Sequence, residues 1–108
     1  MTETARLSRL DALIEELTVD AHDDEEQLSG FLVGVEGMLR RGEPAQIIGV
    51  EVNVAGVDVG PDARTGLIAR VTRDGKTYEV ALADLTFAPG SELGLVVAAY
   101  RRWQGRKR

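Results

Sequence analysis

The chain has 108 residues, of which 44% are hydrophobic and 29% are charged, and its formal net charge is −5. This length and composition are typical of one folded domain with a single hydrophobic core, and they exclude an intrinsically disordered chain. The absence of cysteine excludes disulfides and thiolate-bound metal centres. The acidic charge argues against a broad nucleic-acid-binding surface.

The sequence also lacks the patterns of membrane and secreted proteins. No apolar run approaches the roughly 20 residues that a membrane-spanning helix needs. The N-terminus has no basic start followed by an apolar stretch, which is the pattern of a secretion signal. We therefore expect a cytoplasmic protein that makes no membrane contact, and the lack of cysteine suits that compartment.

The first third of the chain predicts two amphipathic helices. In residues 6–17, apolar residues recur at spacings of three and four, which is one helical stripe. A second helix is predicted to begin after Asp23 or Asp24, whose side chain can cap it, and to close at Gly42. The second apolar stripe consists of Leu28, Phe31, Leu32, Val35, Met38 and Leu39.

Three glycines, Gly30, Gly34 and Gly37, lie inside this second helix on the side opposite its apolar stripe. Each costs about 0.5–1 kcal/mol relative to alanine in a helix interior. A stripe of glycines lets another backbone approach closely, and either the first helix or a second copy of the chain could fill it. We take the three glycines as candidate partner-binding residues. The alternatives are a weak, partly bent helix or a strand at 31–39.

The middle of the chain predicts short antiparallel strands. Pro44 is interpreted as a linker, and residues 48–54 alternate as a half-buried strand before a turn or bulge at Ala55-Gly56. Asp74-Gly75 lies between two alternating runs in residues 66–87 and predicts a hairpin, because glycine tolerates the positive φ of a tight turn. Residues 85–87 are predicted as a short final strand.

The last predicted element is a helix that Ser91 can cap. Its apolar residues at helical spacing are Leu93, Val96, Val97, Tyr100 and Trp103. Because helices and strands do not alternate, the fold class is α+β, with an N-terminal helical pair, a small curved antiparallel sheet and a C-terminal helix. We favour closure of the sheet into an SH3-like barrel over an open sheet.

We expect a single domain over residues 1–108. Its parts are a helical part at 1–43, an antiparallel β part at 44–90, a C-terminal helix at 91–105 and a basic tail at 106–108.

The densest polar cluster is Asp20-Ala-His-Asp-Asp-Glu-Glu26. Calcium prefers six to eight oxygen ligands, and a loop with acidic residues at alternate positions can supply several of them. The candidate metal ligands with this spacing are Asp20, His22, Asp24 and Glu26. The segment does not match an EF-hand loop, because Glu25 stands at the sixth position and Phe31 at the twelfth. The favoured alternative is an acidic helix start that is solvated and caps the helix.

A second cluster is Tyr100-Arg-Arg-Trp-Gln-Gly-Arg-Lys-Arg108. Bases interleaved with aromatic residues can contact phosphates and stack on nucleic-acid bases. Because Tyr100 and Trp103 continue an apolar stripe, we favour core positions for them and a solvated helix end for Arg101 and Arg102. Alternatively, the basic tail docks on the acidic segment of another copy, so Arg101 and Arg102 are candidate partner-binding residues.

No catalytic residues are predicted, because His22 is the only histidine and no nucleophile has a motif around it. The leading hypothesis is a non-enzymatic, cytoplasmic protein-interaction module without a cofactor, whose partner is a protein or a second copy of this chain. The alternatives are weak binding of calcium or another divalent ion by residues 20–26, and nucleic-acid contact by the basic tail, which the acidic body disfavours.

Four stretches in the second half carry a resemblance. They read Gly66-Leu-Ile-Ala-Arg-Val, Tyr78-Glu-Val-Ala-Leu-Ala-Asp-Leu-Thr-Phe, Pro89-Gly-Ser and Ala98-Ala-Tyr-Arg-Arg-Trp-Gln-Gly. With the acidic stretch at the start of the second helix, the chain over residues 22–105 resembles a family of small bacterial and haloarchaeal proteins, some of which are described as calcium-binding. The resemblance implies a calcium role but supplies no ligand motif that can be placed on particular residues.

Overall fold

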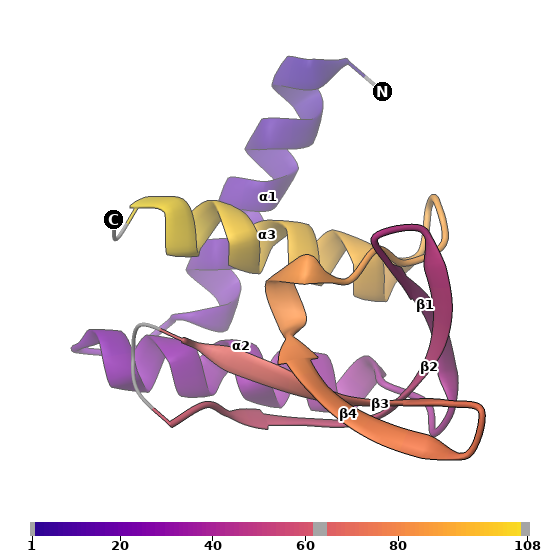
Figure 1. Cartoon of the computed structure of the whole chain (residues 1–108). Coiled ribbons are helices and arrows are strands. Elements are labelled where there is room, and N and C mark those ends of the chain that lie inside the picture. The colour runs from indigo at the N-terminus through magenta and orange to yellow at the C-terminus, as the bar shows by residue number, and fades with distance from the viewer. Residues whose placement is uncertain (1, 62–64, 107–108) are drawn as a thin grey trace.

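Two helices, a four-stranded antiparallel sheet and a final helix follow one another along the chain (Figure 1). The computed structural model describes residues 2–61 and 65–106. The helices are α1 (Glu3–Leu17), α2 (Asp24–Met38) and α3 (Glu92–Arg106). The strands are β1 (Glu43–Ile47), β2 (Val50–Val59), β3 (Leu67–Arg73) and β4 (Lys76–Ala81), and a short 3₁₀ helix, η1 (Leu82–Asp84), follows β4. The predicted α+β class is confirmed.

Each of these three helices begins at a capping side chain. The caps are Thr2, Asp23 and Ser91, whose oxygens accept the main-chain N–H three residues later at 3.1, 2.8 and 2.7 Å. Such caps satisfy N–H groups that have no partner within the helix. Within the described ranges, no helix is both long and apolar enough to cross a membrane.

The end of α2 differs from the prediction. The helix ends at Met38, so Arg40 and Arg41 lie beyond it. Gly42 does have a positive φ of 77°, but it lies in the turn that leads into β1, where the N–H of Glu43 donates to the carbonyl of Arg40 at 3.0 Å. The left-handed glycine therefore serves a loop turn and not the helix end.

The four strands form an antiparallel meander in the order β1-β2-β3-β4. Two-residue turns, Ile48-Gly49 and Asp74-Gly75, join β1 to β2 and β3 to β4. All four turn residues have positive φ, between 49° and 77°, which suits the right-handed twist of a hairpin. The predicted hairpin at Asp74-Gly75 is confirmed.

The first hairpin, which joins β1 to β2, was not predicted. Pro44, interpreted as a linker, lies in β1, where an edge strand accommodates a residue without an N–H. Ile48, predicted as a strand residue, lies in the turn and is 96% exposed. Ile48 is apolar and has the same spacing of two as Val50, Val52 and Val54, so the sequence pattern does not reveal the turn.

A bulge divides β2 into two halves. The pairing register shifts between Val54 and Gly56, so the predicted irregularity at this point is a bulge. The residues before the bulge pair with β1, and the pairing with β3 begins at Asn53 and continues beyond the bulge from Gly56. Figure 1 shows the two halves of β2 running in different directions. Because a bulge bends its strand, it produces the curvature of the sheet.

The sheet is open, and it comes nearest to closing at one isolated β-bridge. The residues after β4, predicted as a strand at 85–87, form η1 and then meet β1 at one point. There, Gln46 and Thr86 exchange two N–H···O bonds of 2.8 Å. The chain then continues toward α3. Because one bridge is not a continuous ladder of hydrogen bonds between strands, the described residues do not form the closed SH3-like barrel favoured from the sequence.

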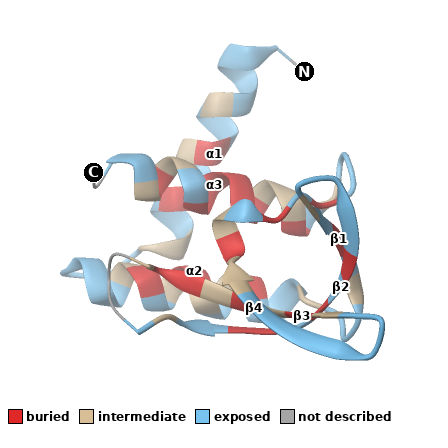
Figure 2. Ribbon diagram, viewed as in Figure 1, coloured by how far each residue is buried: buried red, intermediate tan, exposed pale blue. Residues whose placement is uncertain are grey.

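The core lies between the curved sheet and the helices (Figure 2), and the buried residues in the described ranges are hydrophobic or glycine. In β3, one of the two alternating faces, formed by Leu67, Ala69 and Val71, is buried. On α3, the whole predicted stripe of Leu93, Val96, Val97, Tyr100 and Trp103 is buried. β4 is more exposed, and its Tyr78 side chain is 49% exposed.

Three aromatic rings form the centre of this core. The Phe31 ring centroid lies 5.6 Å from that of Tyr100 and 5.2 Å from that of Trp103. The Tyr100 hydroxyl accepts the N–H of Leu67 at 2.9 Å, and the Trp103 indole N–H donates to Gln27 Oε1 at 2.7 Å. These two bonds fix α3 against β3 and α2.

Candidate functional site

The acidic segment, residues 20–26, begins α2 and is organised by its own carboxylates. Asp23 Oδ1 accepts the N–H of Glu26 at 2.8 Å, and Glu26 Oε2 accepts the N–H of His22 at 2.8 Å. The acids lie in the first helical turn, where the helix dipole favours negative charge. The segment therefore does what the favoured alternative predicts: it caps the helix and faces solvent.

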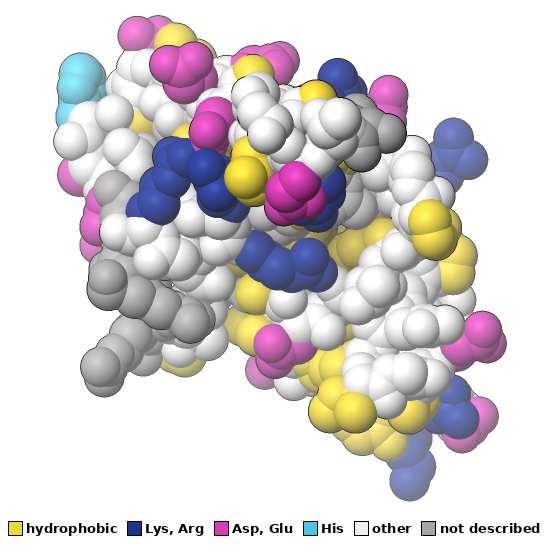
Figure 3. Space-filling view, turned by 90° about the horizontal axis from the view of Figure 1, so that it is seen from above, with side chains coloured by type: hydrophobic (Ala, Val, Ile, Leu, Met, Phe, Trp, Pro, Cys, Tyr) yellow, Lys and Arg dark blue, Asp and Glu magenta, His cyan; other side chains and the backbone are white. Residues whose placement is uncertain are grey.

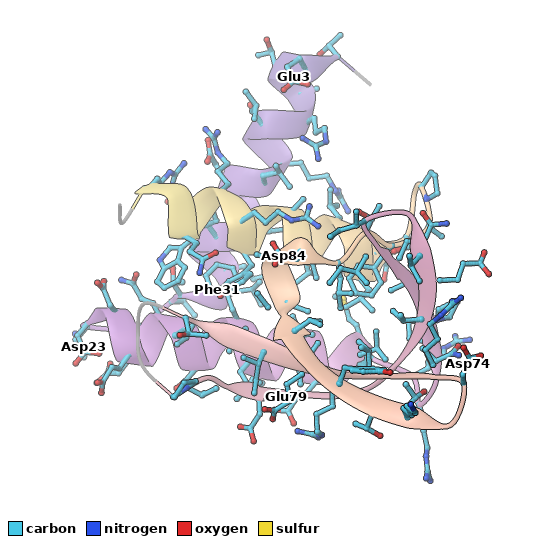
Figure 4. All side chains as sticks on the ribbon, viewed as in Figure 1. Glu3, Asp23, Phe31, Asp74, Glu79 and Asp84 are labelled. Atoms are coloured by element: carbon cyan, nitrogen blue, oxygen red, sulfur yellow. The ribbon has the colours of Figure 1, made fainter. Side chains whose placement is uncertain are left out.

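The four candidate metal ligands are all exposed: Asp20, His22, Asp24 and Glu26. Among residues 2–61 and 65–106, no three His, Asp or Glu side chains come close enough to hold a metal ion. Figure 4 places Asp23 at the outer end of α2, away from Asp74 in the far hairpin turn and from Asp84 in η1. Asp74 and Asp84 thus do not complete a site with the acidic segment.

The glycine face of α2 receives the end of α1. A Cβ added to Gly30 would lie 2.0 Å from the carbonyl oxygen of Leu17, and one added to Gly34 would lie 2.7 Å from Leu17 Cδ2. Nothing lies within 4 Å of the corresponding position at Gly37. Of the three candidate partner-binding glycines, Gly30 and Gly34 thus contact the first helix, which is one of the two partners considered from the sequence.

Arg101, the first of the two candidate partner-binding arginines, is bonded within the chain. It donates to the carbonyls of Ala83, at 2.7 Å, and Leu85, and thereby holds η1 against α3. Burial and, secondarily, the charge of Arg6 lower the pKa of Arg101.

The second arginine, Arg102, joins the two terminal helices. Its Nε lies 2.8 Å from Asp11 Oδ1, and Arg106 pairs with the same carboxylate. The hydrogen bond from Arg102 is the main cause of the lowered pKa of Asp11, and it raises the pKa of Arg102. Sequence reasoning missed Asp11, although Arg102 and Arg106, four residues apart on one helix face, indicate a shared acidic partner.

This cluster predicts a pH-dependent contribution to stability. Because the pKa of Asp11 is lowered in the folded chain, its contribution is present above the ordinary carboxyl pKa of about 3.9 and is lost as the pH falls through the lowered value. We expect Asp11→Asn to melt a few degrees below the parent at neutral pH, since the paired side chains are partly exposed. The difference should shrink as the pH falls through the lowered pKa of Asp11, because the protonated carboxyl no longer pairs with the arginines.

Thermal melts across this pH range check the prediction. Glu15→Gln, which removes an exposed charge from the same helix, is the matched control and should change the melting temperature little. A loss for Asp11→Asn that is the same at every pH would show that the charge of Asp11 is not what joins α1 to α3.

Nucleic-acid contact by the end of α3 finds little geometric support in the described residues. Tyr100 and Trp103, the rings available for stacking, are 0% and 7% exposed. Of the basic tail, Arg106 is described and pairs with Asp11. The aromatic residues therefore belong to the core, as favoured from the sequence.

A hollow with a volume of about 710 Å³ lies between β1, β2 and the segment 86–89. Its charged lining residues are Glu51, Arg73 and Asp74. The Arg73 guanidinium donates to the carbonyl of Glu51 at 2.7 Å and lies 3.8 Å from the Asp74 carboxylate. The single histidine is not in its lining, so the hollow offers no nucleophile–histidine pair.

No protein-family model and no curated protein match this chain, but solved structures share its fold. One, described as "Calcium binding protein in the calcium-binding form", has a TM-score of 0.72 at 20% identity, covering 99% of this chain and 98% of that chain. Another, described as "The crystal structure of Anabaena CcbP", has a TM-score of 0.66 at 19% identity, covering 95% of this chain and 91% of that chain. The chain therefore has, along nearly its whole length, the fold of a small protein described as calcium-binding.

Proposed function

We propose that this protein binds calcium weakly at the acidic segment and catalyses no reaction. The observation that carries the proposal is the fold shared with a protein described in its calcium-binding form, over 99% of this chain. The sequence resemblance over residues 22–105 points in the same direction. The acidic segment supplies the densest group of carboxylates in the chain: Asp20, Asp23, Asp24, Glu25 and Glu26.

The chemistry of these donors fits calcium, but their arrangement is not a preformed cage. Calcium takes oxygen ligands from carboxylates, carbonyls and water, so carboxylates are suitable ligands and the imidazole of His22 is a poor one. Asp23 and Glu26 each use one oxygen for a main-chain N–H and keep a second for an ion. Because three acidic groups do not converge in the described structure, we expect a dissociation constant of about 10⁻⁴–10⁻³ M, the range of weak calcium sites.

Isothermal calorimetry and thermal melts with calcium chloride test the proposal. A ligand that binds only the folded state at about ten times its Kd adds about 1.4 kcal/mol of stability, which raises the melting temperature by several degrees. The informative variant is Asp23→Asn/Glu26→Gln, because both amides can still accept the two N–H groups while two charges are lost. Its response to calcium should fall sharply.

The matched control is Glu36→Gln, which removes an exposed charge from the other end of α2 and should respond to calcium like the parent. Magnesium chloride at the same concentration controls for ionic strength. Absence of both heat and a melting shift at millimolar calcium would contradict calcium binding. Equal shifts for the parent and the double variant would contradict the placement at residues 20–26.

A further inference from the structure

Two neighbouring hollows lie along the seam between α1 and α3. One, of about 590 Å³, lies between α1, the start of α3 and residues 86–91, and the other, of about 480 Å³, lies toward the end of α3. Both are lined by Arg6, Ala98 and Arg101, so together they form one elongated groove, here called the arginine groove. Figure 3 views the molecule from above and shows Lys and Arg side chains around a hollow with hydrophobic side chains beneath.

The positive charge of this groove is compensated only in part, because Arg102 and Arg106 line it and pair with Asp11. Arg6 and Arg9 line it from α1, and neither side chain forms a hydrogen bond or ion pair among the described residues. Arg101 is bonded to neutral carbonyls and not to a carboxylate, and the charge of Arg6 helps to lower its pKa. Glu92 is the acid that lines the same stretch. In a chain of net charge −5, the side chains of Arg6 and Arg9, which have no acidic partner in the described ranges, favour an anionic ligand beside Arg101.

The elongated shape of the groove and the apolar residues that line it restrict which ligands it can bind. The lining between the arginines includes Phe87, Pro89, Leu95 and Ala98, so an occupant would contact apolar side chains as well as charges. Two hollows end to end suit an extended chain better than a single small anion. Guanidinium groups pair with carboxylates through two parallel hydrogen bonds. An apolar floor suits the side chains of a peptide that alternates acidic and apolar residues better than a continuous phosphate backbone.

We propose that the arginine groove binds an acidic peptide segment of a partner protein. Carboxylates of the peptide pair with Arg6 and Arg9, and its apolar side chains lie on the floor formed around Leu95 and Ala98. The acidic segment at residues 20–26 is not part of the lining. The inference therefore goes beyond calcium binding and is tested without calcium.

Fluorescence anisotropy tests this inference with a fluorescein-labelled synthetic peptide in which Glu alternates with Leu, titrated with the full chain at low salt. Arg6→Glu/Arg9→Glu should weaken binding by at least about tenfold, because two attractive pairs become repulsive. The matched control, Arg40→Glu/Arg41→Glu, makes the same change of charge at exposed positions outside the groove and should change the affinity less than about twofold. If the reversed-charge variant unfolds, Arg6→Gln/Arg9→Gln provides the same comparison.

Several results would contradict the inference. Equal weakening by both double variants would assign binding to net charge alone, and equal affinity for a peptide with Gln in place of Glu would assign it to apolar contact alone. Preferential displacement of the peptide by a single-stranded oligonucleotide would indicate a nucleic-acid site. Self-association that is lost in Arg6→Glu/Arg9→Glu would indicate that a second copy occupies the groove instead of a different protein.

Discussion

Replacing Gly30 with alanine is expected to lower the free energy of unfolding by about 3 kcal/mol and the melting temperature by roughly 10–20 °C. The new Cβ would lie 2.0 Å from the carbonyl oxygen of Leu17. That atom belongs to the backbone at the end of α1, so no rotamer change can relieve the clash. The end of α1 would have to move away from α2, and the buried side chains of Leu10 and Ile14 would lose packing.

The other two glycines of the same helix provide a graded control. At Gly34 the nearest atom is the end of the Leu17 side chain, 2.7 Å away, which can rotate, so alanine should cost less there than at Gly30. At Gly37 nothing lies within 4 Å, so alanine should be neutral or stabilising by up to about 1 kcal/mol. Urea unfolding of the three variants measures the series. If Gly30→Ala is as stable as Gly37→Ala, α1 does not approach α2 as described.

Local patterns in the sequence were sufficient to predict the helices and the central hairpin. The stripes of α2 and α3 repeat at helical spacing, and Asp23 and Ser91 are side chains that cap helices wherever they precede such a stripe. Asp74-Gly75 between alternating runs specifies its turn without help from distant residues. These features depend on residues only a few positions apart in the chain. Patterns of that length can be recognised in a single sequence.

The first hairpin could not be predicted because its turn is atypical. Ile48 has a φ of 49°, and a β-branched residue is disfavoured in that region, so the dipeptide Ile48-Gly49 reads as part of a strand. β1 itself contains Pro44 and little apolar character, which also weakens a strand prediction. Pairing with β2, together with the distant bridge from Gln46 to Thr86, establishes this strand.

The candidate site was predicted in composition but not in geometry. The density of acids at residues 20–26 is visible in the sequence, whereas their failure to converge depends on Asp23 and Glu26 turning toward the main chain of α2. The arginine groove depends on the packing of α1 against α3. Arg6 and Arg101 are 95 positions apart in the chain, so no spacing rule brings them together.

Replacing Phe31 with alanine is expected to cost about 3–5 kcal/mol, the range for removal of a buried aromatic ring. Phe31 is 0% exposed, and Figure 4 shows it between α2 and α3. Domains of this size are stable by about 5–15 kcal/mol, so the variant should lose a large share of its stability. Urea unfolding followed by the fluorescence of Trp103, the single tryptophan, measures it, and Phe31→Leu, which keeps most of the volume, should cost less than half as much.

We expect the cost of Phe31→Ala to lie near the top of this range because the neighbouring rings are held in place. Tyr100 is fixed by the N–H of Leu67 and Trp103 by Gln27, so neither ring can easily move into the cavity, and the cost rises with the cavity that remains. Removing one of these bonds should therefore let the site collapse. The double variant Phe31→Ala/Gln27→Ala should lose less stability than the sum of the two single variants, because the two changes share Trp103 as a contact. An additive result, or a loss below about 2 kcal/mol for Phe31→Ala alone, would show that these hydrogen bonds do not set the rigidity of the core.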